Sequence, residues 1–289
     1  MANGIIVIDK PQDWTSHDVV AKLRGILRER RIGHAGTLDP MATGVLPVFV
    51  GRATRAVEFA AEREKEYIAG LRLGQITDTQ DVTGNTLETR PVSVTREQVE
   101  AVLDQFRGDI QQIPPMYSAL KKDGKKLYEL ARRGEEVERK PRPITIYELE
   151  LLEQVSPTDF TLRVLCSKGT YVRTLCHDIG QVLGCGGTLF SLRRTKSAGF
   201  TLEDAVTLEA LNAMETPGDK LLPVESYFYR HPVLQLDSAA AEKKVRNGNT
   251  VRTDAPEGIY RVHSRQQEFL ALSEVKDGCL TTIKSFFEA

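Results

Sequence analysis

The chain begins with a short apolar segment that predicts a buried strand followed by a helix. Residues 5–8 are apolar and β-branched, and the polar Asp9 and the turn-forming Pro11 come directly afterwards. Thr15 or Ser16 can cap a helix, because apolar residues recur at helical spacing over 19–27. The N-terminal region is therefore expected to form a strand, a turn and an amphipathic helix.

Segments further along the chain alternate between strand and helix patterns. Residues 65–73 alternate, with Tyr67 on the apolar face, which predicts a half-buried strand that directs Tyr67 inward. Thr95 and Gln98 have the spacing of a capping box for a helix through Phe106. The same periodicities predict a hairpin of strands at 144–155 and 160–166, and a helix over 172–183 closed by Gly184.

A glycine-rich segment separates the first helix from the strand at 65–73. Residues 33–47 (GHAGTLDPMATGVLP) hold three glycines and two prolines without helical periodicity, so we expect a loop over this range. A loop of this length inside a compact domain is usually functional. Asp39 lies in it, directly before a proline, where an isolated aspartate is most often a turn former. However, His34 lies in the same loop, and no cysteine, serine–histidine or metal-ligating cluster competes for a catalytic role.

An aspartate that acts as an anion benefits from a nearby cation, since an opposite charge favours its ionised form. Arg173 is a candidate partner, because it lies in the first turn of the predicted 172–183 helix, off its apolar stripe. Most arginines at such positions are ordinary surface residues, and the sequence alone does not bring this one to Asp39. Similarly, a single histidine such as His34 is commonly structural, and Tyr67 and Tyr171 could be plain core aromatics.

Two segments are enriched in basic residues. Over 21–32, five Lys or Arg residues are opposed by Glu29 alone. Over 121–142, nine Lys or Arg residues stand against five acids, and prolines flank the segment on both sides. The first cluster is either a solvated face or an RNA-facing edge. The second is either a solvated, mobile insertion or an arm that closes over a polyanionic ligand.

The C-terminal part of the chain has a pattern of its own. A short helix is predicted at 239–246, and strands are predicted at 258–263, 268–272 and 280–286, which together indicate a small, mostly β module. Proline- and glycine-containing linker sequence lies between residues 217 and 232. We therefore predict two domains, 1–230 and 231–289, with the basic insertion over about 109–142 inside the first.

Composition narrows the class of protein. The 289 residues are 40% hydrophobic and 27% charged, which is typical of a globular chain long enough for about two domains. The net charge of −1 excludes a uniformly basic nucleic-acid coat protein, so any polyanion site must be local. No apolar run approaches a signal-peptide core or a membrane span.

Cysteine usage favours a reduced, cytoplasmic setting. The four cysteines form no Cys-x-x-Cys pair and have no histidine at zinc-ligand spacing, so a metal site is not expected. We interpret them as inert small core residues; they are Cys166, Cys176, Cys185 and Cys279.

Five motifs follow one another along the chain. They are Asp9-Lys10-Pro11 with Thr15-Ser16-His17-Asp18, Gly33-His34-Ala35-Gly36-Thr37-Leu38-Asp39-Pro40-Met41-Ala42-Thr43-Gly44, Lys65-Glu66-Tyr67, Lys168-Gly169-Thr170-Tyr171-Val172-Arg173 and Leu192-Arg193-Arg194. In content and order they resemble the motifs of the TruB family of bacterial tRNA pseudouridine synthases. The resemblance covers about residues 4–225, and the tail from about 232 resembles the PUA RNA-binding module that bacterial members often carry. It implies an α+β pseudouridine synthase fold: a mixed, largely antiparallel sheet flanked by helices, plus a small C-terminal β-rich PUA-like module.

The resemblance also implies roles for individual residues. Asp39 matches the essential aspartate, Arg173 its ion-pair partner, and Tyr67 the aromatic that stacks on the target base. His34 matches a histidine that helps to hold the flipped uridine. The remaining substrate-site assignments are Tyr171 and Leu192 as further base-pocket contacts, and Lys10, whose motif with Pro11 supports the active-site loop.

The implied reaction converts the uridine at position 55 in the T-loop of tRNA to pseudouridine, on a base flipped out of the loop. The N1–C1′ bond breaks, the uracil turns in place, and C5 joins C1′, so no cofactor or metal is required. Whether the carboxylate attacks C1′ or abstracts a sugar proton stays open. The expected partner is the T-arm and T-loop of tRNA, with no membrane and no obligatory protein partner, and the expected form is a monomer. RNA contacts are expected from a thumb-like basic insertion, through Lys121, Lys122, Lys125 and Lys126, and also from Arg193 and Arg194.

Two other functions are alternatives to pseudouridine formation. A non-catalytic RNA-binding or RNA-folding protein could keep the same scaffold and would bind RNA without isomerising it. The intact motif around Asp39 argues against that function, although both activities could coexist. A carboxylate-dependent nucleoside hydrolase would normally need a second acid or a metal to activate water, and no such constellation is present in the sequence.

Overall fold

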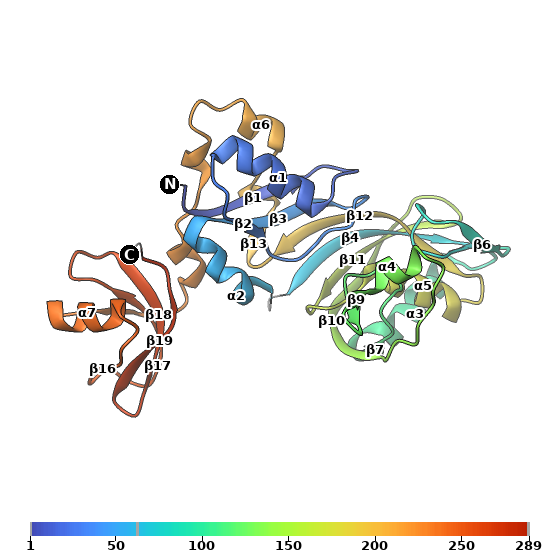
Figure 1. Cartoon of the computed structure of the whole chain (residues 1–289). Coiled ribbons are helices and arrows are strands. Elements are labelled where there is room, and N and C mark those ends of the chain that lie inside the picture. The colour runs from blue at the N-terminus through green and yellow to red at the C-terminus, as the bar shows by residue number, and fades with distance from the viewer. Residues whose placement is uncertain (1, 62–63, 288–289) are drawn as a thin grey trace.

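The computed structural model describes residues 2–61 and 64–287. The molecule is elongated: a long sheet runs through the larger part, and a small β module lies at one end (Figure 1). In the long sheet the strands lie in the order β14-β1-β3-β12-β4-β11-β10-β7, with β2 beside β3 and β13 beside β12. In that order they are β14 Ala205–Val206, β1 Gly4–Lys10, β3 Thr43–Val50, β12 Gly187–Ser197, β4 Lys65–Leu73, β11 Asp159–Cys166, β10 Arg142–Gln154 and β7 Gly108–Gln112, with β2 Ile32–His34 and β13 Phe200–Thr201.

The long sheet is mixed and largely antiparallel. Among the described strands, β1 pairs with β14 and β3 with β12 in parallel, and the other neighbours in this sheet are antiparallel. This arrangement confirms the expected sheet. The strands predicted near the N-terminus, at 65–73, and in the 144–166 hairpin are also confirmed, because their alternating or wholly apolar patterns match β1, β4, β10 and β11.

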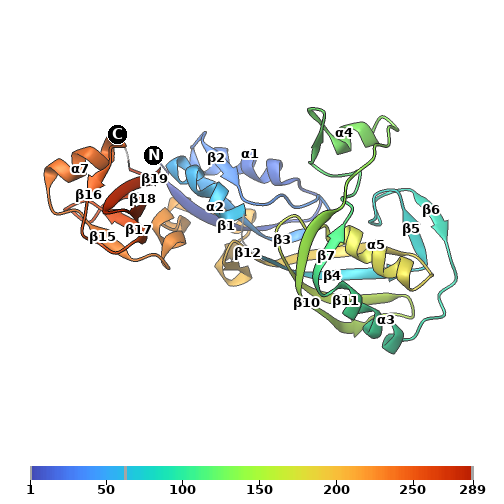
Figure 2. The same ribbon diagram turned by 90° about the horizontal axis from the view of Figure 1, so that it is seen from below.

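Helices lie on both sides of the sheet around β1 and β3, whereas α3 and α5 cover one face of β4, β10 and β11 (Figure 2). Thr15 and Thr95 cap α1 and α3 through capping boxes, so both predicted helix starts are confirmed. The helix predicted over 172–183 is confirmed as α5. The α-helices are α1 Ser16–Leu27, α2 Val57–Ala61, α3 Arg96–Leu103, α4 Leu127–Ala131, α5 Val172–Val182, α6 Leu208–Asn212 and α7 Ala239–Arg246; the 3-10 helices are η1 Gly51–Ala56, η2 Asp104–Phe106, η3 Leu202–Asp204, η4 Pro217–Lys220 and η5 Val224–Phe228.

The hydrophobic core of the larger part consists of three separate apolar clusters. Around β1 and β3, alternate side chains face opposite sides of the sheet: Ile6 and Ile8 pack with α1 and α6, whereas Ile5 and Phe49 pack with η1 and η5. A separate apolar cluster joins β4, β10 and β11 to α3 and α5. Three of the cysteines lie buried in this cluster, as expected for small core residues: Cys166, Cys176 and Cys185.

The loop predicted over 33–47 is shorter than expected. Its first residues belong to β2, and its last residues belong to β3, where Val45 and Leu46 pair with β1. The apolar residues that follow Gly44 therefore continue a buried strand rather than a loop, since that strand is hydrogen-bonded on both sides. What remains is a loop of residues 35–42, which we call the catalytic loop because it carries Asp39, the candidate catalytic residue of the sequence analysis.

The basic insertion projects from the body of the molecule, with α4 at its far end (Figure 2). Residues 109–112 of the predicted insertion are paired in β7, so the part outside the sheet is 113–141, which we call the arm. The arm contains the short hairpin of β8 Lys121–Lys122 and β9 Lys125–Lys126, followed by α4. A second short hairpin, formed by β5 Gln75–Thr77 and β6 Thr86–Thr89, lies beyond the end of β4.

The C-terminal module contains α7 and a sheet ordered β15-β17-β18-β19-β16. The predicted helix at 239–246 and strand at 258–263 are confirmed, and the other two strands begin or end a few residues from the predicted limits. The module packs on the body through apolar side chains that include Phe228 and Phe286. Its strands are β15 Val233–Gln235, β16 Val251–Arg252, β17 Gly258–His263, β18 Phe269–Lys276 and β19 Cys279–Ser285.

Across residues 2–61 and 64–287, no helix has both the length and the apolar composition needed to cross a bilayer. Over the same ranges, no three His, Cys, Asp or Glu side chains are grouped as metal ligands would be.

Candidate active site

The catalytic loop is anchored through Leu38 by buried hydrogen bonds and packs closely at Gly36. Ser16, at the start of α1, accepts a hydrogen bond from the Leu38 N–H (2.9 Å) and donates one to the Leu38 carbonyl (3.2 Å). Gly36 has φ +80°, and a Cβ atom there would lie 3.2 Å from Lys65 Cε, so glycine suits this close approach. Asp39 follows Leu38 directly and is therefore held on a rigid segment.

Lys10 supports the catalytic loop from within the protein. Its side chain is fully buried, and its ammonium donates to the carbonyls of Pro11 (2.8 Å), Trp14 (2.6 Å) and Pro40 (3.1 Å). Burial is the main cause that lowers the pKa of Lys10 to about 8. An ammonium has three donors, and all three are used here, so the assignment of Lys10 to substrate binding is corrected to loop support.

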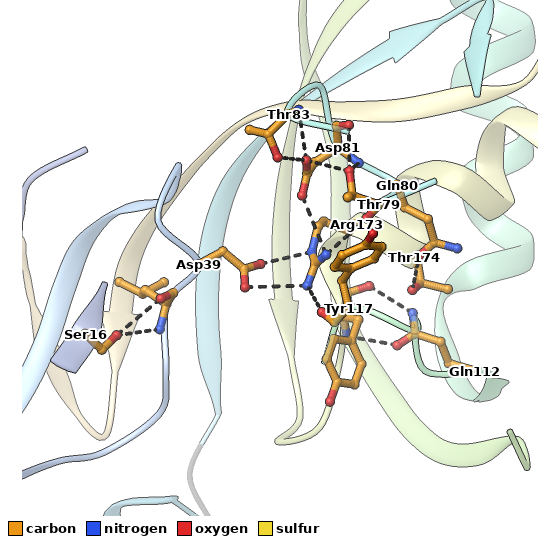
Figure 3. A network of polar contacts seen from close by, with 12 residues as sticks. Ser16, Asp39, Thr79, Gln80, Asp81, Thr83, Gln112, Tyr117, Arg173 and Thr174 are labelled. Carbon is orange, nitrogen blue, oxygen red and sulfur yellow. Dashed lines mark hydrogen bonds and ion pairs between the residues drawn. The ribbon is translucent and has the colours of Figure 1, made fainter. Parts of the chain in front are cut away.

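The loop brings Asp39 to Arg173, which comes from the other half of the sheet. Arg173 Nε lies 3.0 Å from Asp39 Oδ2, and Arg173 Nη2 lies 3.5 Å from Asp39 Oδ1 (Figure 3). The arginine side chain is 6% exposed, whereas the aspartate side chain is 39% exposed. The pair thus presents an accessible carboxylate that is held in place by a buried guanidinium.

Arg173 is itself held by two other segments, the loop that carries Thr79 and Asp81, and the arm. Its Nη1 donates to the Thr79 carbonyl (3.0 Å), its Nη2 donates to the Tyr117 carbonyl (2.8 Å), and Nη1 lies 3.6 Å from Asp81 Oδ2 (Figure 3). Asp81 is 4% exposed. Such a network fixes the plane of the guanidinium and therefore the position at which it can meet Asp39.

Asp81 was missed by the sequence analysis, although its buried carboxylate contacts Arg173 and the polar groups of Thr79 and Thr83. Its Oδ1 accepts hydrogen bonds from the Thr79 hydroxyl (2.8 Å), the Thr83 N–H (2.9 Å) and the Thr83 hydroxyl (2.5 Å). The polar sequence over 77–83 could have drawn attention to this loop, but its sequence carries no catalytic motif.

Tyr67 and Arg194 lie opposite each other on β4 and β12. Burial raises the pKa of the Tyr67 phenol, although the charge of Arg194 opposes this shift, so the phenol is neutral at pH 7. Arg194 is fully buried, and it donates to the carbonyls of Val45 (2.7 Å) and Gly36 (3.0 Å). The expected phosphate contact by Arg194 is wrong, because its side chain is fully buried and its guanidinium bonds to carbonyls inside the protein.

His34 ends β2, at the edge of the catalytic loop. Its ring is in edge-to-face contact with His17, with centroids 5.4 Å apart. Burial, followed by the positive charge of His17 and Arg194, lowers the pKa of His34 to about 4. The imidazole is therefore neutral at pH 7 and can take part in packing and neutral hydrogen bonding.

The other predicted site residues occupy different environments. Tyr171 directly precedes α5, and its pKa is raised mainly by burial, with a smaller contribution from the charge of Asp39. Leu192 is buried next to Tyr67 in the same apolar cluster. Arg193 is 43% exposed and forms a two-point ion pair with Asp9 (2.8 and 3.2 Å). On the arm, Lys121, Lys122 and Lys125 are exposed and Lys126 is half-buried.

Two family descriptions match the chain. "TruB family pseudouridylate synthase (N terminal domain)" matches residues 24–172, and "tRNA pseudouridylate synthase B C-terminal domain" matches residues 173–239. The chain is 47% identical to tRNA pseudouridine synthase B of Stutzerimonas stutzeri, over 95% of this chain and 92% of that one. It is 40% identical to tRNA pseudouridine synthase B of Clostridium kluyveri, over 98% of this chain and 99% of that one.

Two solved structures have the same fold. One, titled "Crystal Structure of a Cbf5-Nop10-Gar1 Complex", has a TM-score of 0.74 and 28% identity over 99% of this chain and 85% of the other. The second, titled "Structure of H/ACA RNP bound to a substrate RNA containing 2'-deoxyuridine", has a TM-score of 0.73 and 26% identity over 99% of this chain and 86% of the other. Both similarities extend over the body and the C-terminal module, so the expected pseudouridine synthase fold is confirmed. With family matches over most of its length and relatives above 40% identity, the chain belongs to the TruB family of pseudouridylate synthases.

Proposed function

We propose that this protein isomerises uridine 55 in the T-loop of tRNA to pseudouridine, with Asp39 as the catalytic group. The observation that carries the proposal is the accessible Asp39 carboxylate held 3.0 Å from the buried Arg173. The relatives named tRNA pseudouridine synthase B supply the substrate class. Isomerisation requires that the N1–C1′ bond breaks, that C5 bonds to C1′, and that the proton released at C5 is balanced by one gained at N1.

The geometry of the site fits an isomerisation, in which the substrate is neither oxidised nor reduced. A fixed carboxylate can act at the reacting sugar or base, because its position is set before the substrate arrives. Arg173 neutralises part of its charge without covering it, since the arginine approaches from the buried side. The neutral His34, which ends β2 directly before the catalytic loop, is proposed to hold the flipped uridine together with Tyr171 and Leu192.

The direct test is to incubate the purified protein with a tRNA transcript and map the modified base. We expect conversion at a single T-loop uridine without added cofactor. A protein that bound tRNA tightly but formed no pseudouridine would contradict the proposal and favour an RNA-binding or RNA-folding role.

Tyr67→Leu is expected to reduce the rate of pseudouridine formation by about 10- to 100-fold, because base–aromatic stacking contributes ~1–3 kcal/mol. Extraction of the base from the loop costs a few kcal/mol, and the ring offsets part of that cost. The single-turnover rate at saturating tRNA measures the effect. Tyr67→Phe is the matched variant: it keeps the ring and should lose less activity than the leucine variant. Equal losses in both would contradict a stacking role.

Replacement of the four arm lysines, Lys121, Lys122, Lys125 and Lys126, by alanine is expected to weaken tRNA binding and flatten its salt dependence. The logarithm of the tRNA association constant decreases linearly with the logarithm of the salt concentration. The magnitude of that negative slope should decrease by about 0.7–0.9 for each phosphate that is no longer neutralised. Titration of tRNA binding at several salt concentrations measures the slope. Glu135→Gln, in the same arm, removes an acidic group, which neutralises no phosphate, and should leave the slope unchanged. An unaltered slope in the lysine variant would show that these charges are only solvated.

We also propose the domain boundaries, the oligomeric state and the location of the protein. Residues 1–230 would form the catalytic domain and 231–289 a PUA-like module that adds RNA-binding surface, supported by the separate sheet of that module. Its sheet packs against the body through an apolar cluster. This packing would hold the RNA-binding surface of the module at a fixed distance and orientation from that of the catalytic domain. The protein would act as a monomer in the cytoplasm, where its tRNA substrate is found.

A further inference from the structure

Gln112 connects the root of the arm to the helix that carries Arg173. It is the last residue of β7, the edge strand of the sheet, and the arm begins at the next residue. Its side chain is 3% exposed. Gln112 Oε1 accepts a hydrogen bond from the Tyr171 N–H (2.8 Å), and Gln112 Nε2 donates one to the Tyr171 carbonyl (3.1 Å; Figure 3). Both polar atoms of the amide are therefore used on one backbone unit.

That backbone unit is the start of α5. Tyr171 is the N-cap residue of the helix, and its side chain makes no capping hydrogen bond. Its carbonyl also accepts the first hydrogen bond of the helix, from the Leu175 N–H (3.0 Å). Since the N-cap side chain does not anchor the helix, the Gln112 amide supplies an anchor from outside. Arg173 lies only two residues further along the chain, so a displacement of Tyr171 moves the guanidinium.

A second contact joins the same segment to Arg173 directly. The Tyr117 carbonyl, within the first residues of the arm, accepts a hydrogen bond from Arg173 Nη2 (2.8 Å), the nitrogen that also faces Asp39 (3.5 Å). Arg173 is thus held directly at its guanidinium by Tyr117 of the arm, and indirectly by Gln112 through the backbone of Tyr171. The lysines of β8 and β9 follow a few residues later.

We propose that Gln112 is a positioning residue for pseudouridine formation. Its amide fixes the backbone of Tyr171 and thereby the start of α5, which keeps the Arg173 guanidinium at the distance and orientation that pair it with Asp39. This inference rests on the proposed function. It accounts for a buried glutamine at the end of an edge strand, where an apolar residue would satisfy packing alone. The consequence is specific: the chemical step should depend on Gln112 more than tRNA affinity does.

Gln112→Ala removes both hydrogen bonds and leaves the Tyr171 N–H without its partner. We expect the single-turnover rate at saturating tRNA to fall by about 10- to 100-fold, because small misplacements of a catalytic group have effects of this size. The dissociation constant for tRNA should change by less than about threefold, since Gln112 is buried and faces no RNA. Gln111→Ala is the matched control, because Gln111 is the neighbouring exposed residue of the same strand.

Gln112→Glu distinguishes the hydrogen bonds from the shape of the side chain. A charged carboxylate still accepts from the Tyr171 N–H, but its second oxygen then faces the Tyr171 carbonyl oxygen without a proton between them. A protonated carboxyl restores the donor and reproduces both bonds. The rate of Gln112→Glu relative to the unaltered protein should therefore rise as the pH falls from about 8 to about 5.5, whereas the ratio for Gln112→Ala should stay flat. Gln111→Glu should show no such dependence.

The results of these experiments distinguish failure of the Gln112 inference from failure of the proposed function. A normal rate in Gln112→Ala, a loss confined to tRNA affinity, or a pH-independent ratio in Gln112→Glu would overturn the positioning role. Thermal unfolding of each variant is measured alongside, and if the alanine variant does not fold, the pH dependence of the glutamate variant decides the question. An unaltered protein that forms no pseudouridine would contradict the proposed function instead, whereas an active protein that tolerates Gln112→Ala would contradict only this inference.

Discussion

Asp39→Asn is expected to lower pseudouridine formation by at least about 1,000-fold while tRNA affinity stays within several-fold. Asparagine has the shape of aspartate, so the catalytic loop should keep its contacts with Ser16 and Lys10. What disappears is the negative charge, and with it both the nucleophilic or basic oxygen and the ion pair with Arg173. The measurement is single-turnover conversion of a tRNA transcript, together with a binding titration.

The matched control for this variant is Asp237→Asn, an exposed aspartate outside the catalytic loop. It should leave both the rate and the affinity unchanged. Substantial activity in Asp39→Asn would show that another group performs the chemistry and would remove the basis of the proposed function. A large loss of tRNA affinity in that variant would instead indicate that the charge acts in binding.

Local periodicity was sufficient for most elements of the fold. The alternation over 65–73 and the 3–4 spacing over 172–183 depend on neighbouring residues, and both elements were confirmed as β4 and α5. The loop predicted over 33–47 was wrong at its end because Gly44 and Pro47 suggested a break. In the structure, Gly44 instead has φ +102° and packs within β3 against the backbone of Arg194, where a Cβ atom would lie 2.2 Å from the Arg194 carbonyl oxygen.

The environment of charged residues was harder to predict than the elements that carry them. Arg173 lies off the apolar stripe of its own helix, and it is buried only because three segments from elsewhere in the chain close around it. Arg194 has the same charge as an RNA-binding arginine, but its side chain is fully buried and donates to the carbonyls of Gly36 and Val45. Asp81 gave no motif at all. For Arg173 and Arg194 the deciding contacts come from residues far away in the sequence, and Asp81 joins the site only through the distant Arg173, so periodicity reports none of these contacts.

The strongest test of this long-range network is Arg173→Lys, which keeps the charge and changes the geometry. The arginine contacts the Asp39 and Asp81 carboxylates and the carbonyls of Thr79 and Tyr117 through a planar group with donors in several directions. A lysine ammonium is a point donor and cannot meet acceptors this far apart at once. The carboxylate of Asp39 should therefore lose its fixed position, although a positive charge remains nearby.

We expect Arg173→Lys to reduce the single-turnover rate by about 100-fold or more at saturating tRNA, with a loss of about 1–3 kcal/mol in the free energy of unfolding. Arg72→Lys is the control, because Arg72 also makes a two-point ion pair, with Asp159 (2.9 Å for both bonds), but outside the network. Arg72 is partly exposed, so its replacement should cost less than about 1 kcal/mol and leave the rate unchanged. Equal rates in the two lysine variants would mean that charge alone, rather than the planar fork of Arg173, prepares Asp39 for catalysis.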